Sequence, residues 1–370
     1  MRIKNGLVFV NREFVAADVD FDTAITAVGS DKGEGFDASG CYVVPGFVDI
    51  HTHGAVGCDF SDGKPEDMQP MADYYAAHGV TSFLATTMTL SEDTLTDAMH
   101  TIRDFQRCGG AKCAGVHLEG PFLSSAKKGA QAECHLHRPD SGMFHRLNAA
   151  SGGSVKLVTV ACEESGGMEF IREVSRVCTV SLGHSVADYD TAMAAFAAGA
   201  EHATHLYNGM PPLLHRAPGI IGAALDSGAS VELICDGLHI HPAVIRAAYR
   251  MFGDKLNLIS DSLRCAGMPD GDYELGGQAI TLRCGKATLK NSDTLAGSAI
   301  SLLDAVRNAV RFGLPLEAAI YAAATAPALA AKLEDVGSIS VGKRADLLVL
   351  DRDLQIRAVF VDGKCLTGEH

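Results

Sequence analysis

The sequence predicts an α/β fold, a (β/α)8 TIM-like barrel that carries a small β-sandwich built from both chain termini. Apolar segments rich in β-branched residues alternate with helical segments through the middle of the chain. About eight such units are present, enough to close a barrel. Both termini instead contain short strand-like segments and turns. No GxGxxG motif follows a strand, which disfavours the alternative, an open doubly wound sheet with a dinucleotide site.

Both ends of the chain contain short strand-like segments separated by turn residues. Asn5-Gly6 separates two strand-like segments, and an Asn-Gly pair predicts a two-residue hairpin turn. Residues 345–350 and 356–361 are strand-like, and Asp362-Gly363 predicts another turn. We therefore expect two domains, the small β-sandwich at 1–45 and 336–370 and the barrel at 46–335.

The barrel strands are the apolar segments of the middle of the chain. The first ends at His51, and the others span 80–87, 114–118, 155–161, 177–182, 202–206, 231–235 and 256–260. Helices are expected over 66–78, from an N-cap at Ser91, and over 188–198, 241–252, 298–311 and 315–332. Turn residues break this rhythm between 262 and 295, which predicts β-hairpins inserted near the end of the barrel.

The first predicted barrel strand ends in two histidines, His51 and His53. Side chains two residues apart on a strand point to the same side, so both imidazoles would converge on one point. Imidazole is the commonest protein ligand for transition metals. The alternative is a pair of surface histidines beside a loop glycine. The other strand ends separate these two interpretations.

Barrel enzymes place their active sites at the carboxyl ends of the strands. Each polar residue found there has an ordinary explanation when taken alone: a histidine can bond to backbone, and a carboxylate can cap a loop or a helix. A metal ligand or a proton carrier at nearly every strand end is not expected by chance, and the set predicts a metal site. Its members after the first strand are Glu119, His184, His205, Asp236, His239 and Asp261.

Nitrogen and carboxylate ligands without a thiolate suit a divalent metal ion such as Zn, Fe or Mn. Glu119, between two histidine pairs, could bridge two ions, so one or two are expected per subunit. Such an ion lowers the pKa of its bound water to about 7. An unligated Asp261 could take the proton of that water and return it to the leaving group. The chemistry predicted is metal-assisted hydrolysis.

The composition argues against several classes of function. A formal net charge of −14 disfavours a nucleic-acid partner, because such surfaces neutralise phosphates with basic residues. An anionic small substrate would need local positive charge. Eleven cysteines without a CxxC pair indicate reduced thiols. No apolar run approaches the ~18 residues of a membrane span, and no apolar signal core follows Met1, so a soluble cytoplasmic protein is expected.

Several motifs, taken in chain order, resemble the amidohydrolase superfamily. The segment PGFVDIHTHG around the histidine pair and the tail GKRADLL at 342–348 are shared with many of its members. More specific motifs look like the N-acetylglucosamine-6-phosphate deacetylases, and the likeness covers nearly the whole chain. These motifs are HLEGPF at 117–122, GHS at 183–185, THLYNGM at 204–210, DGLH at 236–239 and LAGS at 295–298.

This resemblance implies an activity and a role for each matching residue. The activity is removal of acetate from N-acetyl-D-glucosamine 6-phosphate, which belongs to amino sugar metabolism. Glu119, His184 and His205 match the main metal ligands of that family, and Asp261 matches its catalytic acid/base. The residues that match substrate contacts are Ala130, Asn208, Gly209, Arg216, His239, Ala296, Gly297 and Ser298.

The resemblance also implies a homodimer. Arg216 and His239 match residues that hold the sugar phosphate, with the arginine reaching in from the neighbouring subunit. A forked guanidinium suits phosphate and would supply the positive charge that the overall composition lacks.

Two features vary within that family. His51 and His53 resemble members that bind two metal ions rather than one. Gln131 stands where some members carry a histidine thought to polarise the acetyl carbonyl. Its NH₂ group could donate that hydrogen bond to the substrate, or a second metal ion could act as Lewis acid instead. The rival functions are another amide hydrolase of the superfamily, acting on cyclic amides or N-acyl amino acids, and a non-catalytic metal-binding homologue.

Overall fold

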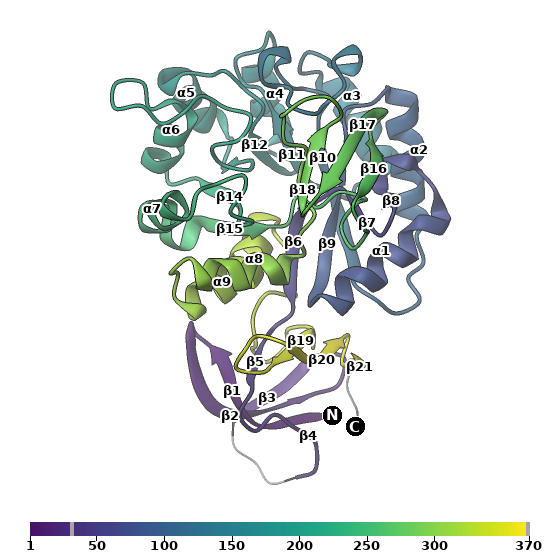
Figure 1. The fold of residues 1–370 in the computed structure, drawn as a ribbon, viewed down its shortest axis with the longest axis vertical. Helices are drawn as coiled ribbons and strands as arrows, with labels where there is room; N and C mark the ends of the chain where they lie inside the picture. Colours follow the sequence, from purple (N-terminus) through teal and green to yellow (C-terminus); the bar gives the residue numbers. More distant parts are fainter. Residues whose placement is uncertain (30–32, 368–370) are drawn as a thin grey trace.

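The computed structural model describes residues 1–29 and 33–367. Figure 1 shows a large upper body, in which helices surround a sheet, and a smaller sheet below it. The upper body is a nearly closed barrel of eight parallel strands, and the lower sheet is separate and mostly antiparallel. The predicted fold class is therefore confirmed.

The barrel strands follow one another around the sheet in chain order. Most of their residues are buried, as expected for parallel strands that helices cover on the outside. The strands are β6 (Phe47–Thr52), β9 (Val80–Thr87), β10 (Lys112–Glu119), β11 (Val155–Val160), β12 (Thr179–Leu182), β13 (His202–Ala203), β14 (Ser230–Ile234) and β15 (Leu256–Ile259).

Helices alternate with these strands and pack on their outer face (Figure 1). They are α1 (Pro65–Ala77), α2 (Glu92–Asp104), α3 (Ser141–Ala150), α4 (Gly167–Val174), α5 (Tyr189–Ala198), α6 (Gly219–Ser227), α7 (Pro242–Phe252), α8 (Leu302–Arg311) and α9 (Leu316–Ala330). The helix predicted after Ser91 begins as expected, because the Ser91 hydroxyl accepts a hydrogen bond from the Thr94 amide at 3.2 Å. Among the described residues, no helix has both the length and the apolar character needed to cross a bilayer.

The terminal sheet joins strands from both ends of the chain around a buried core of its own. The strand order is β21-β20-β19-β5-β1-β2-β3, with β4 paired to β1. Their bounds are β1 (Arg2–Val10), β2 (Glu13–Phe21), β3 (Ile25–Gly29), β4 (Phe36–Asp37), β5 (Tyr42–Pro45), β19 (Leu347–Leu350), β20 (Ile356–Val361) and β21 (Lys364–Thr367). The turn predicted at Asp362-Gly363 joins β20 to β21. The domain boundaries at 45 and 336 remain predictions.

The hairpin predicted at Asn5-Gly6 is wrong. β1 continues through both residues, and the turn into β2 lies at Asn11 and Arg12, whose φ angles are +50° and +71°. Asn5, with φ +62°, instead makes an irregularity in β1, where its amide donates to an Asp18 carboxylate oxygen at 3.0 Å. Residues with positive φ occur in bulges as well as in hairpin turns, so the Asn5-Gly6 pair by itself could not distinguish a bulge from a turn.

A three-stranded antiparallel sheet occupies the segment predicted as inserted hairpins at 262–295. It consists of β16 (Gly271–Leu275), β17 (Gln278–Arg283) and β18 (Lys286–Leu289). Two predicted boundaries differ from the structure by more than two residues. The strand expected over 202–206 ends at Ala203, and α8 begins at Leu302 because Ser301 and Asp304 form a capping box.

Candidate active site

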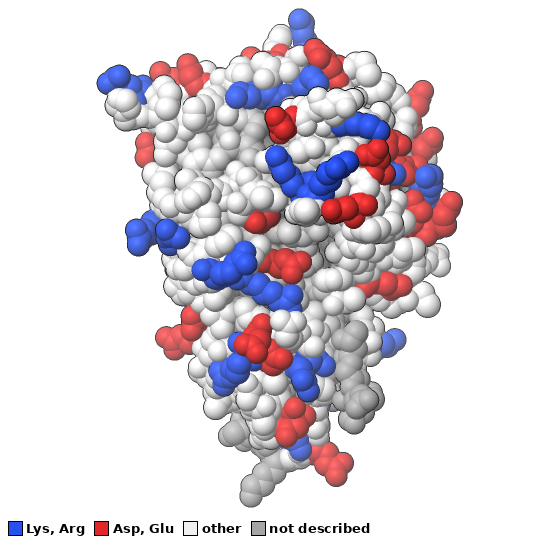
Figure 2. Space-filling model, viewed as in Figure 1, with Lys and Arg blue, Asp and Glu red and all other residues white. Residues whose placement is uncertain are grey.

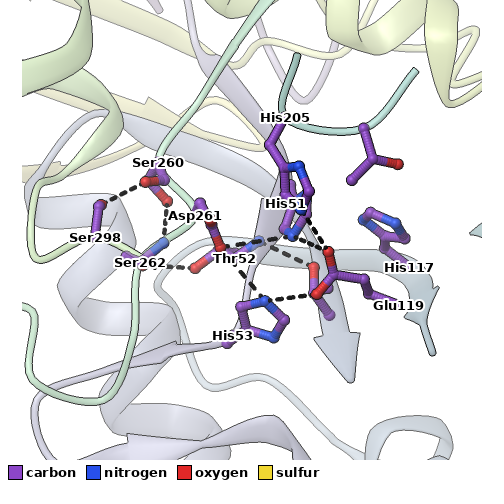
Figure 3. Close-up of polar contacts among 12 residues, drawn as sticks. His51, Thr52, His53, His117, Glu119, His205, Ser260, Asp261, Ser262 and Ser298 are labelled. Atoms are coloured by element: carbon purple, nitrogen blue, oxygen red, sulfur yellow. Dashed lines mark hydrogen bonds and ion pairs between the residues drawn. The ribbon is translucent and has the colours of Figure 1, made fainter. Parts of the chain in front are cut away.

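The two ends of the barrel sheet meet at predicted site residues. The Asp261 amide donates to the His51 carbonyl oxygen at 2.9 Å, and the His53 amide donates to the Ser262 carbonyl oxygen at 2.8 Å. These bonds lie at the carboxyl ends of β6 and β15. Closing the barrel therefore brings the histidine pair and Asp261 together, and Figure 3 shows their side chains turned toward Glu119.

Glu119, His184 and His205 form one group of potential ligand atoms. Glu119 Oε1 lies 3.2 Å from His184 Nε2 and 3.1 Å from His205 Nε2. The two Nε2 atoms are 2.9 Å apart, and all three side chains are buried. The backbone at both histidines has a positive φ, +48° at His184 and +26° at His205, a strained conformation typical of functional sites.

This group fits a divalent metal ion. His184 Nδ1 donates to the Lys127 carbonyl oxygen at 2.7 Å, so the neutral ring carries its lone pair on Nε2. That lone pair faces a second imidazole nitrogen and a carboxylate oxygen, and these three acceptors crowd one point. A cation at that point would satisfy all three, and their chemistry suits Zn, Fe or Mn.

A second group of potential ligand atoms lies on the other side of Glu119. His53 Nε2 is 3.3 Å from Glu119 Oε2 and 3.4 Å from Asp261 Oδ1. His51 Nε2 is 3.5 Å from Glu119 Oε1 and 3.6 Å from Asp261 Oδ1, with no hydrogen-bond partner among the described residues. His51, His53 and Asp261 together could hold a metal ion, and Glu119 stands between the two groups.

The ionisable side chains of the site determine one another's charge in the metal-free protein. Burial opposes a charge on His53, but hydrogen bonds to Asp261 and Glu119 outweigh it and raise its pKa to about 9. Burial also opposes ionisation of Asp261, yet the positive field of His51 and the hydrogen bond from His53 hold the pKa of Asp261 below its ordinary value. Asp261 is therefore a carboxylate at neutral pH.

A cavity of about 190 Å³ opens on these side chains. Leu275 and Thr294, at the edges of the inserted sheet, form part of its wall. The predicted site residues that line it are His53, Glu119, Ala130, Gln131, His184, His205, Asn208, Gly209, His239, Asp261 and Gly297. A larger cavity of about 580 Å³ lies at the opposite ends of β12, β13 and β14, and its lining contains none of the predicted residues. The smaller cavity is therefore the candidate active site, because of the side chains that line it and in spite of its size.

Three predicted substrate residues lie outside the lining of the 190 Å³ cavity. Ala296 and Ser298 are buried, and the Ser298 amide donates to the Asp261 carbonyl oxygen at 2.7 Å, so this serine supports the end of β15. Arg216 is exposed, in the loop before α6. The structure does not bring Arg216 into the site of its own chain, and its expected reach into a neighbouring site remains a prediction.

Gln131 is held at both ends of its amide. Its Oε1 accepts a hydrogen bond from the Thr89 amide at 2.7 Å, and its Nε2 donates to Glu119 Oε2 at 2.8 Å. The first bond fixes which end of the amide faces Glu119. Gln131 thus orients the carboxylate that stands between the two ligand groups.

Sequence reasoning missed Glu232 and His117. His117, behind His51, is not a metal ligand, because Nδ1 donates to the Ile50 carbonyl oxygen and Nε2 accepts from the Thr159 hydroxyl. Burial, aided by the charge of His51, lowers the pKa of His117 to about 3, so the ring is neutral. Glu232 is a fully buried carboxylate on β14. Its signal was present in the sequence, since a charged residue inside an apolar strand requires buried partners.

Known proteins resemble this chain over most of its length. Residues 42–366 match the amidohydrolase family. The chain is 37% identical over 331 residues to the N-acetylglucosamine-6-phosphate deacetylase of Bacillus subtilis, a match covering 87% of this chain and 83% of that relative. It is also 37% identical to the N-acetylgalactosamine-6-phosphate deacetylase of Escherichia coli O157:H7, covering 86% of each chain.

A solved structure shares the fold over both domains. It is a variant of N-acetyl-D-glucosamine-6-phosphate deacetylase from Mycobacterium smegmatis in complex with N-acetyl-D-glucosamine-6-phosphate. The TM-score is 0.93 at 32% sequence identity, and the match covers 99% of this chain and 98% of that one.

Proposed function

The chain belongs to the amidohydrolase family, and we propose that it hydrolyses the N-acetyl group of N-acetyl-D-glucosamine 6-phosphate, giving glucosamine 6-phosphate and acetate. One observation carries this proposal. The buried group of Glu119, His184 and His205, with Asp261 beside it, lines a cavity in a chain that is 35–37% identical to curated deacetylases of this sugar phosphate.

Two sets of side chains are proposed to hold the metal. Glu119, His184 and His205 would hold one divalent ion, and His51 and His53, with carboxylate oxygens of Glu119 and Asp261 close by, would hold a second. A bound ion of this kind polarises a carbonyl oxygen and lowers the pKa of a water molecule to about 7.

Asp261 carries the proton in the proposed reaction. Its carboxylate is deprotonated at neutral pH and lines the cavity beside both ligand groups. It accepts a proton from the attacking water and then gives that proton to the amine nitrogen of the sugar as the carbon–nitrogen bond breaks. General acid–base catalysis of this kind contributes about 10²–10⁴-fold to a rate.

The remaining lining residues are proposed to position the sugar. Ala130, Asn208, Gly209 and Gly297 face the cavity, and His239 lies there with its Nδ1 held by Asp236 at 2.7 Å. We assign the phosphate to His239 and to Arg216 of a second subunit, which makes the enzyme a homodimer. In Figure 2 the lysine and arginine side chains of the visible face are interspersed with acidic ones. No broad basic field stands out on that face.

Acetate release tests the function directly. We expect purified enzyme to release acetate from N-acetylglucosamine 6-phosphate, to lose this activity in a strong chelator and to regain it on addition of Zn²⁺ or Mn²⁺. N-acetylgalactosamine 6-phosphate belongs in the same assay, because a relative that acts on it is 37% identical. An enzyme that releases acetate from neither sugar phosphate, but cleaves N-acetyl amino acids or a cyclic amide, would contradict the proposal.

A non-catalytic role is the remaining alternative, and the site argues against it. A protein that only stored or sensed a metal would have no use for an ionised Asp261 facing the cavity beside the ligand groups. We propose that the enzyme is cytoplasmic, because its eleven cysteines, an odd number without a CxxC pair, suit reduced thiols.

A further inference from the structure

Glu232 lies beneath the ligand groups and has no part in the proposed reaction. Its side chain is fully buried on β14, and it is absent from the lining of the cavity. Glu232 Oε2 accepts a hydrogen bond from His51 Nδ1 at 2.8 Å and one from the His205 backbone amide at 3.0 Å. Glu232 Oε1 accepts a third from His202 Nε2 at 3.2 Å. A buried carboxylate with three donors is a specific arrangement, because an unpaired charge there would be costly.

The bond to His51 determines where that ring points. With Nδ1 tied to Glu232, the neutral His51 ring that a metal ion requires carries its lone pair on Nε2, which faces Glu119 and Asp261. His53 is held differently, since its Nδ1 has no hydrogen-bond partner among the described residues. Of the histidine pair, His51 is therefore the one whose ring is anchored from behind.

The bond to His205 supports a strained turn. His205 has φ +26°, just beyond the end of β13, and its amide and that of Leu206 both donate to Glu232, to the side chain and the carbonyl oxygen respectively. One carboxylate oxygen, Oε2, thus contacts a histidine from each of the two ligand groups.

We propose that Glu232 is a positioning residue that fixes the His51 ring and the His205 turn, so that one buried carboxylate sets the geometry of both metal-ligand groups. The inference rests on the proposed function in one respect, because it assumes the proposed metal ligands but neither the substrate nor the reaction. Substitution of a residue that hydrogen-bonds a metal-bound histidine from behind typically weakens metal affinity by about 10–100-fold.

Two substitutions separate position from charge. Glu232→Gln removes the charge but keeps the reach. Its carbonyl oxygen can accept both bonds from His51 and His205, and its NH₂ can donate to His202 Nε2 when the neutral His202 ring carries its proton on Nδ1. Glu232→Asp keeps the charge but is one methylene too short to reach His51. The measurement is Zn²⁺ affinity and the number of Zn²⁺ ions per subunit, by competition with a chromogenic chelator. We expect Glu232→Asp to bind Zn²⁺ at least about 10-fold more weakly than the wild type and Glu232→Gln to stay within about threefold.

The opposite order of the two variants, or equal affinities in both, would overturn the proposal. Asn257→Ala is the matched control, since Asn257 pairs with Glu232 in the β14–β15 register and is fully buried. Its side chain donates to Ser230, Val231 and Lys255, none of which is a proposed ligand. Equal loss of Zn²⁺ affinity in this control would show a general effect of damage to the barrel and overturn the assignment. Failure of the wild type to release acetate from sugar phosphates would contradict the proposed function but leave this Zn²⁺ measurement intact.

A second measurement does not depend on the aspartate variant folding. In Zn²⁺-loaded wild type, the His51 Nδ1–H should give a downfield, slowly exchanging proton resonance that is absent from His51→Gln and retained in Glu232→Gln. Its absence from the wild type would overturn the proposal.

Discussion

Asp261 and Glu119 are neighbouring buried carboxylates with different surroundings. Glu119 contacts histidines on both sides and accepts from Gln131, whereas the ion pairs of the Asp261 carboxylate with described residues are those with His51 and His53. This difference leaves Asp261 the freer of the two to exchange a proton. It also allows a substitution at Asp261 that spares the group formed by Glu119, His184 and His205.

Asp261→Asn should therefore separate metal binding from turnover. The variant keeps the size of the side chain but cannot accept a proton, so we expect retained metal at the Glu119 group and a loss of at least about 100-fold in turnover. Acetate release and metal content measured on the same sample check this. Near-normal turnover would exclude Asp261 as the proton carrier.

Gly209 provides a steric test of the histidine geometry. It has φ +61°, and an added Cβ would lie 3.1 Å from His184 Nδ1 and 3.4 Å from His205 Cε1. Gly209→Ala should press on both rings and lower metal affinity. Gly153→Ala is the control, because Gly153 has φ +78° but open space around its Cβ position. Both variants should lose about 1–2 kcal/mol of stability from backbone strain, with metal loss in Gly209→Ala alone.

His53 should make the stability of the metal-free protein depend on pH. Its folded pKa of about 9 lies above the ordinary value of 6.5. Protonation of His53 therefore stabilises the folded state fully below pH 6.5, and this contribution is lost as the pH rises through 9. The contribution to the free energy of unfolding is roughly 3 kcal/mol. Urea unfolding of chelator-treated protein at both pH values measures it. His53→Gln should reduce this dependence without abolishing it, because the pKa values of His51 and His184 are raised as well. A wild type that is equally stable at both values would contradict the prediction.

At the scale of elements, β1 shows how a glycine can be required without making a turn. A Cβ on Gly6 would lie 2.5 Å from Val43 Cγ2 on the neighbouring strand β5, in the core of the terminal sheet. Gly6→Ala should cost about 1–3 kcal/mol through overpacking. Gly29→Ala, at the end of β3 with nothing near its Cβ position, should change stability by less than about 0.5 kcal/mol. Chemical unfolding of both variants measures the difference, and equal costs would show that the contact with Val43 relaxes freely.

The same scale explains which elements were predictable. Long apolar strands and amphipathic helices such as α2 carry their periodicity in a few neighbouring residues, and they lie where the sequence placed them. β13 was predicted too long, because the turn at His205 is imposed by its contacts with Glu232 on the next strand. A segment whose conformation depends on a distant strand cannot be assigned from its own residues.

At the scale of the whole molecule, the proposed dimer allows a complementation test. If Arg216 acts in the neighbouring site, Arg216→Ala should raise KM for the phosphorylated sugar far more than for the unphosphorylated one. Mixing Arg216→Ala and Asp261→Asn subunits should then restore activity, because each mixed dimer would contain one intact site. After full subunit exchange about a quarter of all sites would be intact. Mixtures no more active than their separate components would rule out sharing of the site between subunits.

The sequence by itself determined the fold class, most of the strand ends and the candidate ligands, because periodicity and residue chemistry are local properties. Only the tertiary structure decided how those residues meet. Barrel closure brings β6 against β15, so His51 bonds to Asp261 across about two hundred residues of chain. The bond between Glu232 on β14 and His51 on β6 likewise joins strands far apart in the chain, whereas Glu232 meets His205, and Gln131 meets Glu119, between neighbouring segments. The contacts of His51 with Asp261 and Glu232 join distant strands, and the spacing of residues along the chain contains no record of them.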